Sequence, residues 1–268
     1  MISISDGIIT GAHFHNSPNK SGPLLPDTIV MHYTAGTSMS GAVKWLSNPR
    51  AKASAHLVVG RDGEVVQLVS FKEVAWHAGR SRWRGRSGLN NYSIGIEIVN
   101  AGPLIRHADG QYRTHFGKTI DDPGDVVIAT HKHESETRYW HSYTESQLNK
   151  VEELVLALID EYPPIQEIVG HDDIAKGRKS DPGPAFPMER YLTLVEPRQE
   201  TRPDLMVVTA RQLNVREGPG TQYDKLDFGP LKRGTEVSVL EREAPWAFVS
   251  VDEGMDGWVS ENYLALKR

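Results

Sequence analysis

The residues best suited to chemistry are two histidines and one carboxylate, which stand in two separate segments. His171 and Asp181 share a loop, residues 169–187, in which glycine and proline recur. His32 follows an apolar, β-branched run at residues 28–31, so its imidazole should emerge at the rim of a buried strand. Two histidines and one carboxylate are a typical catalytic zinc set, because three protein ligands leave the fourth tetrahedral position open for water. A structural zinc site usually closes all four positions with thiolates, and the chain has no cysteine.

The composition limits the classes of protein to which the chain can belong. Its 268 residues suit one domain of about 180 residues and a second of about 60. Without an apolar run near the ~20 residues that a bilayer requires, we expect no membrane span. A formal net charge of -5 gives no reason to expect nucleic acid as a partner. The absence of cysteine excludes disulfides and thiolate catalysis but does not choose a redox compartment.

The elements that must position these side chains follow from the hydrophobic pattern. Short strands rich in Val, Ile and Leu are expected at residues 28–34, 55–60, 64–70 and 93–99. Three helices are expected at residues 40–47, 144–162 and 188–195, the longest of them capped by Thr144 with Gln147 and ended by Pro163. Strands that alternate with helices predict an α/β domain, with a mixed central sheet flanked by helices.

The pattern changes near the C-terminus. A charged, proline-containing stretch predicts a linker at residues 196–205, after a first domain at residues 1–195. Residues 206–268 hold short alternating segments separated by Gly/Pro turns, which indicates a small all-β barrel.

Three segments of the first domain closely resemble the zinc-dependent N-acetylmuramoyl-L-alanine amidases of the type 2 family. They are residues 29–36, residues 92–100 and residues 171–187, and they occur in the family's order. The resemblance extends over about residues 25–190. It implies that His32, His171 and Asp181 are zinc ligands.

The same resemblance places two further residues in the reaction. Glu97 falls on the family's catalytic acid/base position, where a carboxylate can take a proton from zinc-bound water and pass it to the departing amine. Lys179 falls on the second catalytic position and would stabilise the oxyanion of the tetrahedral intermediate. Taken without the surrounding motifs, Glu97 could equally be a salt-bridged carboxylate and Lys179 a solvated lysine.

Candidate substrate contacts lie between two of the expected strands. Trp76, His77, Arg82 and Trp83 combine aromatic faces with cations, which suits sugar rings and the carboxylates of a peptide. The family has a similar segment that lines its groove, and His56 matches a family position near the cleft. The alternatives are that Trp76 belongs to the core, that the arginines form a solvated rim, and that His56 is a satisfied strand histidine.

A histidine-rich segment and the C-terminal region are the remaining features of the sequence. Residues 131–141 contain three histidines whose spacing fits no compact ligand set, so this polar segment is interpreted as a solvated or groove-flanking loop. Residues 209–220 and 257–259 resemble bacterial SH3-like domains, which often hold wall hydrolases on peptidoglycan. Tyr223, Trp246 and Trp258 could form a ligand groove there, although Trp258 is better suited to the barrel core.

Together these features predict a zinc amidase that cleaves the bond between N-acetylmuramic acid and L-alanine in peptidoglycan or muropeptides. Two alternatives stay open, namely a non-catalytic wall-binding protein and a zinc peptidase that acts within the stem peptide. The N-terminus shows no secretory signal, so action on the wall would require phage-type lysis or signal-independent export, and cytoplasmic recycling is the other route. A monomer is the default expectation.

Overall fold

The computed structural model describes residues 2–195, 204–251 and 255–267, and the chain divides into two compact units, residues 1–200 and 201–268. Most of the predicted linker, at residues 196–203, lies outside the described residues. The exact domain boundaries therefore stay a prediction. None of the helices in the described part of the chain is long and apolar enough to cross a membrane.

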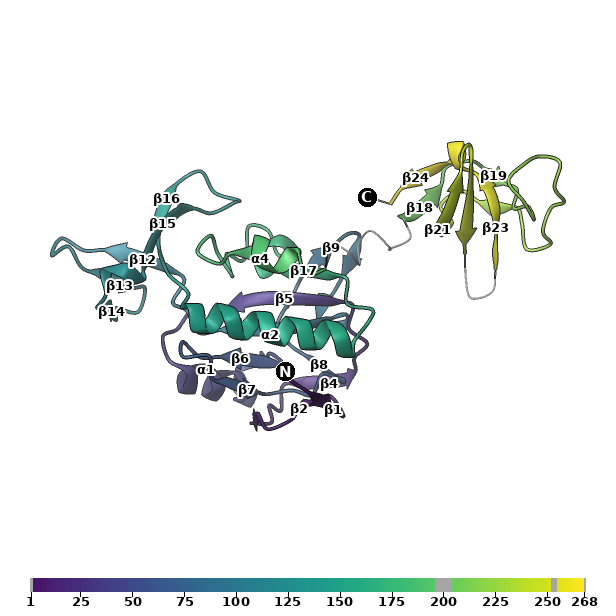
Figure 1. The fold of residues 1–268 in the computed structure, drawn as a ribbon. Helices are drawn as coiled ribbons and strands as arrows, with labels where there is room; N and C mark the ends of the chain where they lie inside the picture. The colour runs from purple at the N-terminus through teal and green to yellow at the C-terminus, as the bar shows by residue number, and fades with distance from the viewer. Residues whose placement is uncertain (1, 196–203, 252–254, 268) are drawn as a thin grey trace. The chain divides into compact units, whose positions relative to one another are not determined.

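A six-stranded mixed sheet forms the centre of the first unit (Figure 1). Its strands, in sheet order, are β17 (Glu167–Gly170), β5 (Thr28–Tyr33), β11 (Ser93–Ile98), β6 (Leu57–Val59), β7 (Val65–Gln67) and β3 (His13–Phe14). The first four run parallel to one another, while β7 is antiparallel to β6 and β3 is parallel to β7. Central parallel strands are buried on both faces, which explains their nearly continuous apolar sequences.

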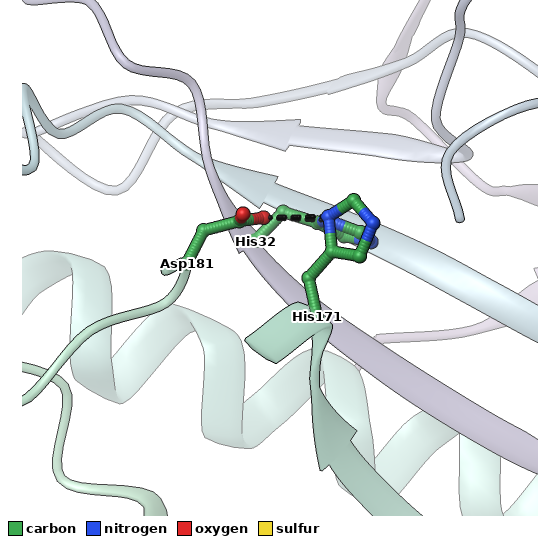
Figure 2. Close-up of side chains that lie close together, drawn as sticks. All are labelled: His32, His171 and Asp181. Carbon is green, nitrogen blue, oxygen red and sulfur yellow. Dashed lines mark hydrogen bonds and ion pairs between the residues drawn. The ribbon is translucent and has the colours of Figure 1, made fainter. Parts of the chain in front are cut away.

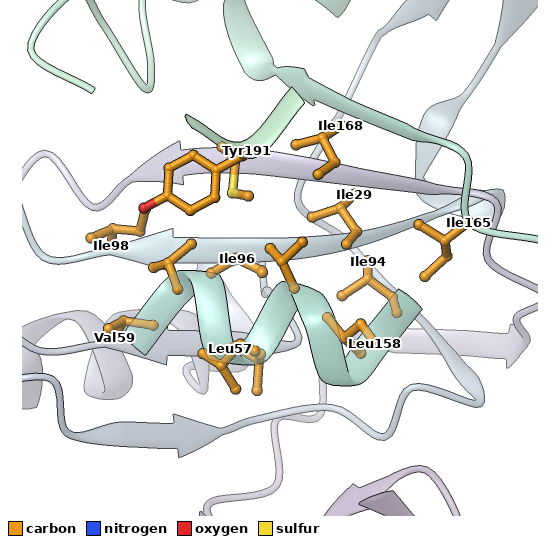
Figure 3. Close-up of a cluster of buried hydrophobic side chains, with 14 of the residues drawn as sticks. Ile29, Leu57, Val59, Ile94, Ile96, Ile98, Leu158, Ile165, Ile168 and Tyr191 are labelled. Atoms are coloured by element: carbon orange, nitrogen blue, oxygen red, sulfur yellow. The ribbon is translucent and has the colours of Figure 1, made fainter. Parts of the chain in front are cut away.

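The pleat of β5 and β11 decides which side chains face the core. Ile29 and Met31 of β5 and the isoleucines of β11 pack against the long helix α2 (Glu145–Glu161), as Figure 3 shows for several of them. Because successive side chains of a strand alternate between faces, His32 and Glu97 point to the face away from α2. The two residues are also paired in register, so they stand side by side.

Helix α2 confirms the capping box and the apolar stripe that its sequence predicts. The Thr144 side chain accepts from the Gln147 N–H and the Gln147 side chain accepts from the Thr144 N–H. The buried residues include Leu148, Val151 and Leu154. The other helices are α1 (Met39–Leu46), α3 (His171–Ile174) and α4 (Met188–Leu192), with short 3-10 turns at Pro49–Ala51, Leu89–Asn91 and Pro123–Asp125.

A second sheet lies where the sequence suggested a polar loop. Its strands, in sheet order, are β14 (Thr119–Ile120), β13 (Tyr112–Thr114), β12 (Pro103–Arg106), β16 (Thr137–His141) and β15 (Val126–Thr130). We call residues 103–141 the insert sheet. The interpretation of residues 131–141 as a solvated or groove-flanking loop holds only in part. Residues 131–136 form a loop that is mostly exposed, but residues 137–141 form β16, and His131 and His141 are buried. His141 is paired with Val126 across the sheet, whereas His131 lies in the loop, where its ring stacks on Trp140 and contacts Asp172.

Three two-stranded pairs complete the first unit. They are β1 (Ile4–Ser5) with β2 (Ile8–Ile9), β4 (Lys20–Pro23) with β8 (Glu73–Ala75), and β9 (Arg82–Trp83) with β10 (Arg86–Ser87).

The second unit is an all-β domain with its own apolar core. Its five-stranded sheet contains β23 (Asp256–Ser260), β22 (Trp246–Ser250), β21 (Glu236–Glu243), β18 (Asp204–Val208) and β24 (Leu264–Leu266). β19 (Gln212–Leu213) pairs with β20 (Leu231–Lys232), and a 3-10 turn spans Glu261–Tyr263. Trp258 is half-buried against Phe248 rather than in the core, and Tyr223 is exposed.

We predict that Thr144→Ala lowers the free energy of unfolding by about 1 kcal/mol, because the first turn of α2 loses its side-chain acceptor. Chemical denaturation would measure the change. Thr144→Ser should retain most of the stability, and a Thr144→Ala protein as stable as the wild type would contradict the assigned role of the cap.

Candidate active site

Three ligand atoms converge at the ends of two neighbouring strands. His32 lies near the end of β5, His171 directly follows β17, and Asp181 comes from the loop after α3. His32 Nδ1 and His171 Nδ1 are 3.0 Å apart, and each lies 2.9 Å from Asp181 Oδ2 (Figure 2). All three residues are buried. Because β5 and β17 are parallel neighbours, their carboxyl ends meet at one edge of the sheet, which brings the two histidines together.

Hydrogen bonds on the far side of each imidazole fix its tautomer. His171 Nε2 lies 3.1 Å from the Ala78 carbonyl oxygen. A carbonyl oxygen only accepts, so the neutral His171 ring carries its proton on Nε2 and leaves Nδ1 bare toward the centre.

His32 reaches the same state through a second histidine. His77 Nε2 donates to the Ser93 carbonyl oxygen at 3.2 Å, which leaves His77 Nδ1 as an acceptor. His32 Nε2 lies 3.0 Å from His77 Nδ1 and therefore donates to it. His32 Nδ1 is then bare as well. A chain of hydrogen bonds from the backbone of β11 thus sets the state of a candidate metal ligand.

A glycine in β11 makes room for these hydrogen bonds. The ring of His77 lies on Gly95 of β11, where an added Cβ would stand 2.4 Å from His77 Cγ. Any larger residue at position 95 would displace the ring and break its contact with His32.

The electrostatics of the centre favour a bound cation. Burial, followed by the charge of His171, lowers the pKa of His32 to about 4. Burial alone would raise the pKa of Asp181, but its close contacts with His171 and His32 outweigh burial and hold the pKa below its usual range. Near neutral pH the centre therefore holds an ionised carboxylate and a bare imidazole nitrogen in contact. Two nitrogens and one oxygen in this arrangement fit a divalent ion such as zinc.

Glu97 lies on the same face of the sheet as this centre. Its Oε2 is sealed from solvent and has no hydrogen-bond partner among the described residues. Burial raises the pKa of Glu97 well above its usual value, Asp181 raises it further, and Lys179 opposes both. A carboxyl group with a raised pKa beside a metal site is suited to hold and release a proton.

A cavity of about 610 Å³ opens over these residues. Glu97, His171, Asp181 and Lys179 line it, and Lys179 is exposed at its edge. Four of the five residues expected to carry the chemistry thus line one cavity, and the fifth, His32, contacts two of them, His171 and Asp181.

The predicted substrate contacts are only partly brought to the cavity. Trp76 and His77 line it, but His77 is nearly buried with both ring nitrogens engaged. His56 is fully buried; it accepts from the Gly95 N–H and donates to the Glu73 carbonyl, so it matches the alternative of a satisfied strand histidine.

Arg82 and Trp83 lie on β9, outside the residues that line the cavity. The Trp83 indole donates to Glu167 Oε2 at 2.6 Å, and its ring packs against a buried cluster that includes Val30 and Leu89. This placement gives Trp83 a structural role and does not support substrate contact for either residue.

The sequence did not predict two aromatic residues of the cavity. Trp45 of α1 and Phe116 of the insert sheet both line the cavity, and both are more than half exposed. The exposed side of an amphipathic helix was a usable signal for Trp45. No local pattern ties Phe116 to a site that lies far from it in sequence.

Two family models match the chain. One for N-acetylmuramoyl-L-alanine amidases (Amidase_2) matches residues 21–184, and one for the bacterial SH3 domain matches residues 211–265. The 1,6-anhydro-N-acetylmuramyl-L-alanine amidase AmpD of Escherichia coli (strain K12) is 36% identical over 145 residues, which are 54% of this chain and 59% of that protein.

Two further comparisons agree with these matches. The N-acetylmuramoyl-L-alanine amidase AmiD of Escherichia coli (strain K12) is 30% identical over 170 residues, which are 60% of this chain and 50% of that protein. A crystal structure of a selenomethionine AmpD derivative superposes with a TM-score of 0.52 at 27% identity, over 72% of this chain and 98% of that one. The chain spans about half the length of the curated relatives it matches.

We predict that His77→Ala weakens zinc binding by about 10- to 100-fold, because His32 loses the acceptor that fixes its tautomer. Competition with a chromophoric chelator would measure the affinity. His15→Ala, at an exposed histidine outside the chain of hydrogen bonds, is the matched control and should bind zinc like the wild type. Equal affinities for the two variants would show that His77 does not position His32.

Proposed function

The chain belongs to the N-acetylmuramoyl-L-alanine amidase family, and on that premise we propose that it hydrolyses the amide bond between N-acetylmuramic acid and the L-alanine of the stem peptide. The observation that carries the proposal is the convergence of two bare imidazole nitrogens and one carboxylate beside the buried, unpartnered oxygen of Glu97. This arrangement unites a cation site with a proton carrier, which amide hydrolysis requires.

His32, His171 and Asp181 would hold the metal, and zinc suits two nitrogens and one oxygen in a tetrahedral site with one open position. Zinc bound there would polarise the scissile carbonyl and make a water molecule acidic enough to lose a proton near neutral pH. The protein supports these ligands with backbone acceptors, the Ala78 carbonyl for His171 and the Ser93 carbonyl, through His77, for His32. Such support orients the rings before the metal arrives.

Glu97 would move the proton. Its carboxylate takes a proton from the attacking water and delivers it to the amine of L-alanine as the amide bond breaks. The carboxyl group faces a cavity whose neighbours exclude solvent from Oε2, so the proton is not exchanged freely with bulk water. A raised pKa also favours the protonated state that the second transfer needs.

Lys179 would stabilise the negative oxygen of the tetrahedral intermediate. Its ammonium lowers the pKa of both Glu97 and His32, so its charge acts on the centre although the side chain is exposed. An exposed ammonium can move toward an oxyanion as it forms, at a smaller cost than a buried cation would carry when the cavity holds no substrate.

The second unit would hold the enzyme on its substrate. The bacterial SH3 match covers residues 211–265, nearly the whole unit. Tethering to the wall raises the local substrate concentration without adding catalytic contacts. We propose intact peptidoglycan as the substrate for this reason, with muropeptides as the smaller alternative, and a monomer as the working state.

We predict that Glu97→Gln lowers kcat/KM by about 10²- to 10⁴-fold, because the amide cannot carry the proton. Mass spectrometry of sacculi and soluble muropeptides, digested with zinc-loaded protein, would detect free stem peptides with a new L-alanine amine. Glu64→Gln, at an exposed glutamate outside the cavity, is the matched control and should cleave like the wild type.

Other outcomes of the same digestion point elsewhere. A new amine within the stem peptide would assign the activity of a zinc peptidase. Substrates that stay intact while the protein sediments with sacculi would assign a wall-binding protein without catalysis.

We also predict that Glu97→Gln stabilises the metal-free protein at pH 8 but not at pH 4. The pKa of Glu97 is raised in the folded state, so the stability of the wild type is fully present below the usual pKa of about 4.5 and is lost as the pH rises through the raised value. Glutamine removes this dependence. Denaturation of chelated protein at both pH values would measure it, and identical pH profiles would contradict the burial of the Glu97 charge.

A further inference from the structure

We propose that the insert sheet forms a sugar-binding wall of the active-site cavity, in which Phe116 and Trp45 stack on a pyranose ring of the glycan strand. The identity of the sugar rests on the proposed function, whereas the surface itself does not. Neither aromatic residue belongs to the segments that carry the metal ligands or Glu97.

The insert sheet is a separate layer that the chain builds between β11 and α2. It shares no strand with the six-stranded sheet, and it has a small apolar cluster of its own that includes Leu104 and Ile120. Figure 1 shows β12 to β16 projecting from the end of α2, on the side where α1 lies. A layer with its own sheet and cluster can hold a side chain in place at its edge.

Contacts on two sides fix the insert sheet to the rim of the cavity. Lys118 Nζ donates to Thr37 Oγ1 at 2.8 Å, in the loop that leads to α1. At its other end, His131 Nε2 lies 2.9 Å from Asp172 Oδ2, and both side chains are buried. Asp172 directly follows the candidate ligand His171. The insert sheet is therefore held both to the loop that precedes α1 and to the metal-ligand loop, by which we mean residues 171–181 with the candidate ligands His171 and Asp181.

The tip of the β13–β14 hairpin carries Phe116 into this rim. Phe116 is 51% exposed and Trp45 is 59% exposed, yet both line the cavity of about 610 Å³ that also contains Glu97. His115 packs edge-on against the Phe116 ring at 5.0 Å between centroids. Two large rings left open to solvent in one cavity are the kind of surface that a ligand covers.

The chemistry of the cavity assigns a sugar to these rings rather than the stem peptide. A stem peptide is anionic, and the cations that line the cavity, Arg178 and Lys179, come from the metal-ligand loop. Phe116 and Trp45 offer neutral aromatic faces, which suit the C–H face of a pyranose. The scissile bond joins the peptide to the glycan, so a substrate placed at Glu97 must extend in both directions.

The kinetic test uses the full-length, zinc-loaded protein and glycan strands with attached peptides. Phe116→Ala and Trp45→Ala should each raise KM by about five- to tenfold, which corresponds to roughly 40–60 Å² of lost apolar contact. The loss should fall on KM rather than kcat, and Phe116→Tyr should restore binding. Ile105→Ala removes an exposed residue of the same sheet that does not line the cavity, so it should behave like the wild type.

A second measurement needs no hydrolysis. The indole N–H resonance of Trp45, assigned by its loss in Trp45→Phe, should shift when a peptide-free oligosaccharide of alternating N-acetylglucosamine and N-acetylmuramic acid is added. Phe116→Ala should raise the Kd read from this titration by about five- to tenfold, and Ile105→Ala should not change the Kd. Because the probe reports on one side chain, sugar bound to the second unit does not contribute.

The two measurements separate failure of this inference from failure of the proposed function. Unchanged KM and unchanged indole response in Phe116→Ala would overturn the sugar-binding wall even if the enzyme is active. An indole shift caused by free stem peptide, and not by the oligosaccharide, would also overturn it. If no substrate is cleaved but the oligosaccharide shifts the indole of the wild type and binds Phe116→Ala about five- to tenfold more weakly, the wall is supported and the amidase proposal fails.

Discussion

The contact of three acceptor atoms at the end of β5 is the constraint on which the rest of the site depends. His32 Nδ1, His171 Nδ1 and Asp181 Oδ2 lie within 3.0 Å of one another in a buried position. Lone pairs that face each other repel, so this geometry is favourable only with a cation or a proton between them. The protein offsets part of that cost with hydrogen bonds on the far side of each ring.

The sheet provides the rigidity that this contact requires. β5 is central, with β17 and β11 as its parallel neighbours, and α2 covers the face opposite the site. The alternation of side chains along β5 and β11 gives the apolar residues to the core and leaves His32, Gly95 and Glu97 for the other face. One strand pair thus serves both stability and chemistry, and Gly95 is needed because the ring of His77 occupies the space of a side chain.

The sequence alone was informative where the pattern around a residue indicates its role. The position of His32 at the end of an apolar strand and the loop of His171 and Asp181 both predicted a metal site, and the structure brings these residues together. The interpretation of Trp76, His77, Arg82 and Trp83 as one substrate surface was less successful. The four residues are close in sequence, but Trp83 on the β9–β10 hairpin donates to Glu167, while both ring nitrogens of His77 are engaged by His32 and the Ser93 carbonyl.

The sequence by itself determined the α/β class, the capped helix α2 and the β-rich second unit, because hydrophobic period and capping are local properties of the chain. Its resemblance to the amidase family also predicted the five residues of the candidate centre. Only the tertiary structure decided which nitrogen of each histidine faces the centre, because the Ala78 and Ser93 carbonyls that fix the tautomers are distant in sequence from the rings they orient. It also decided that residues 103–141 form a sheet and that Phe116 meets the same cavity as Trp45. The pairing of β12 with β16 and the meeting of Phe116 with Trp45 join segments tens of residues apart, which no window of sequence contains.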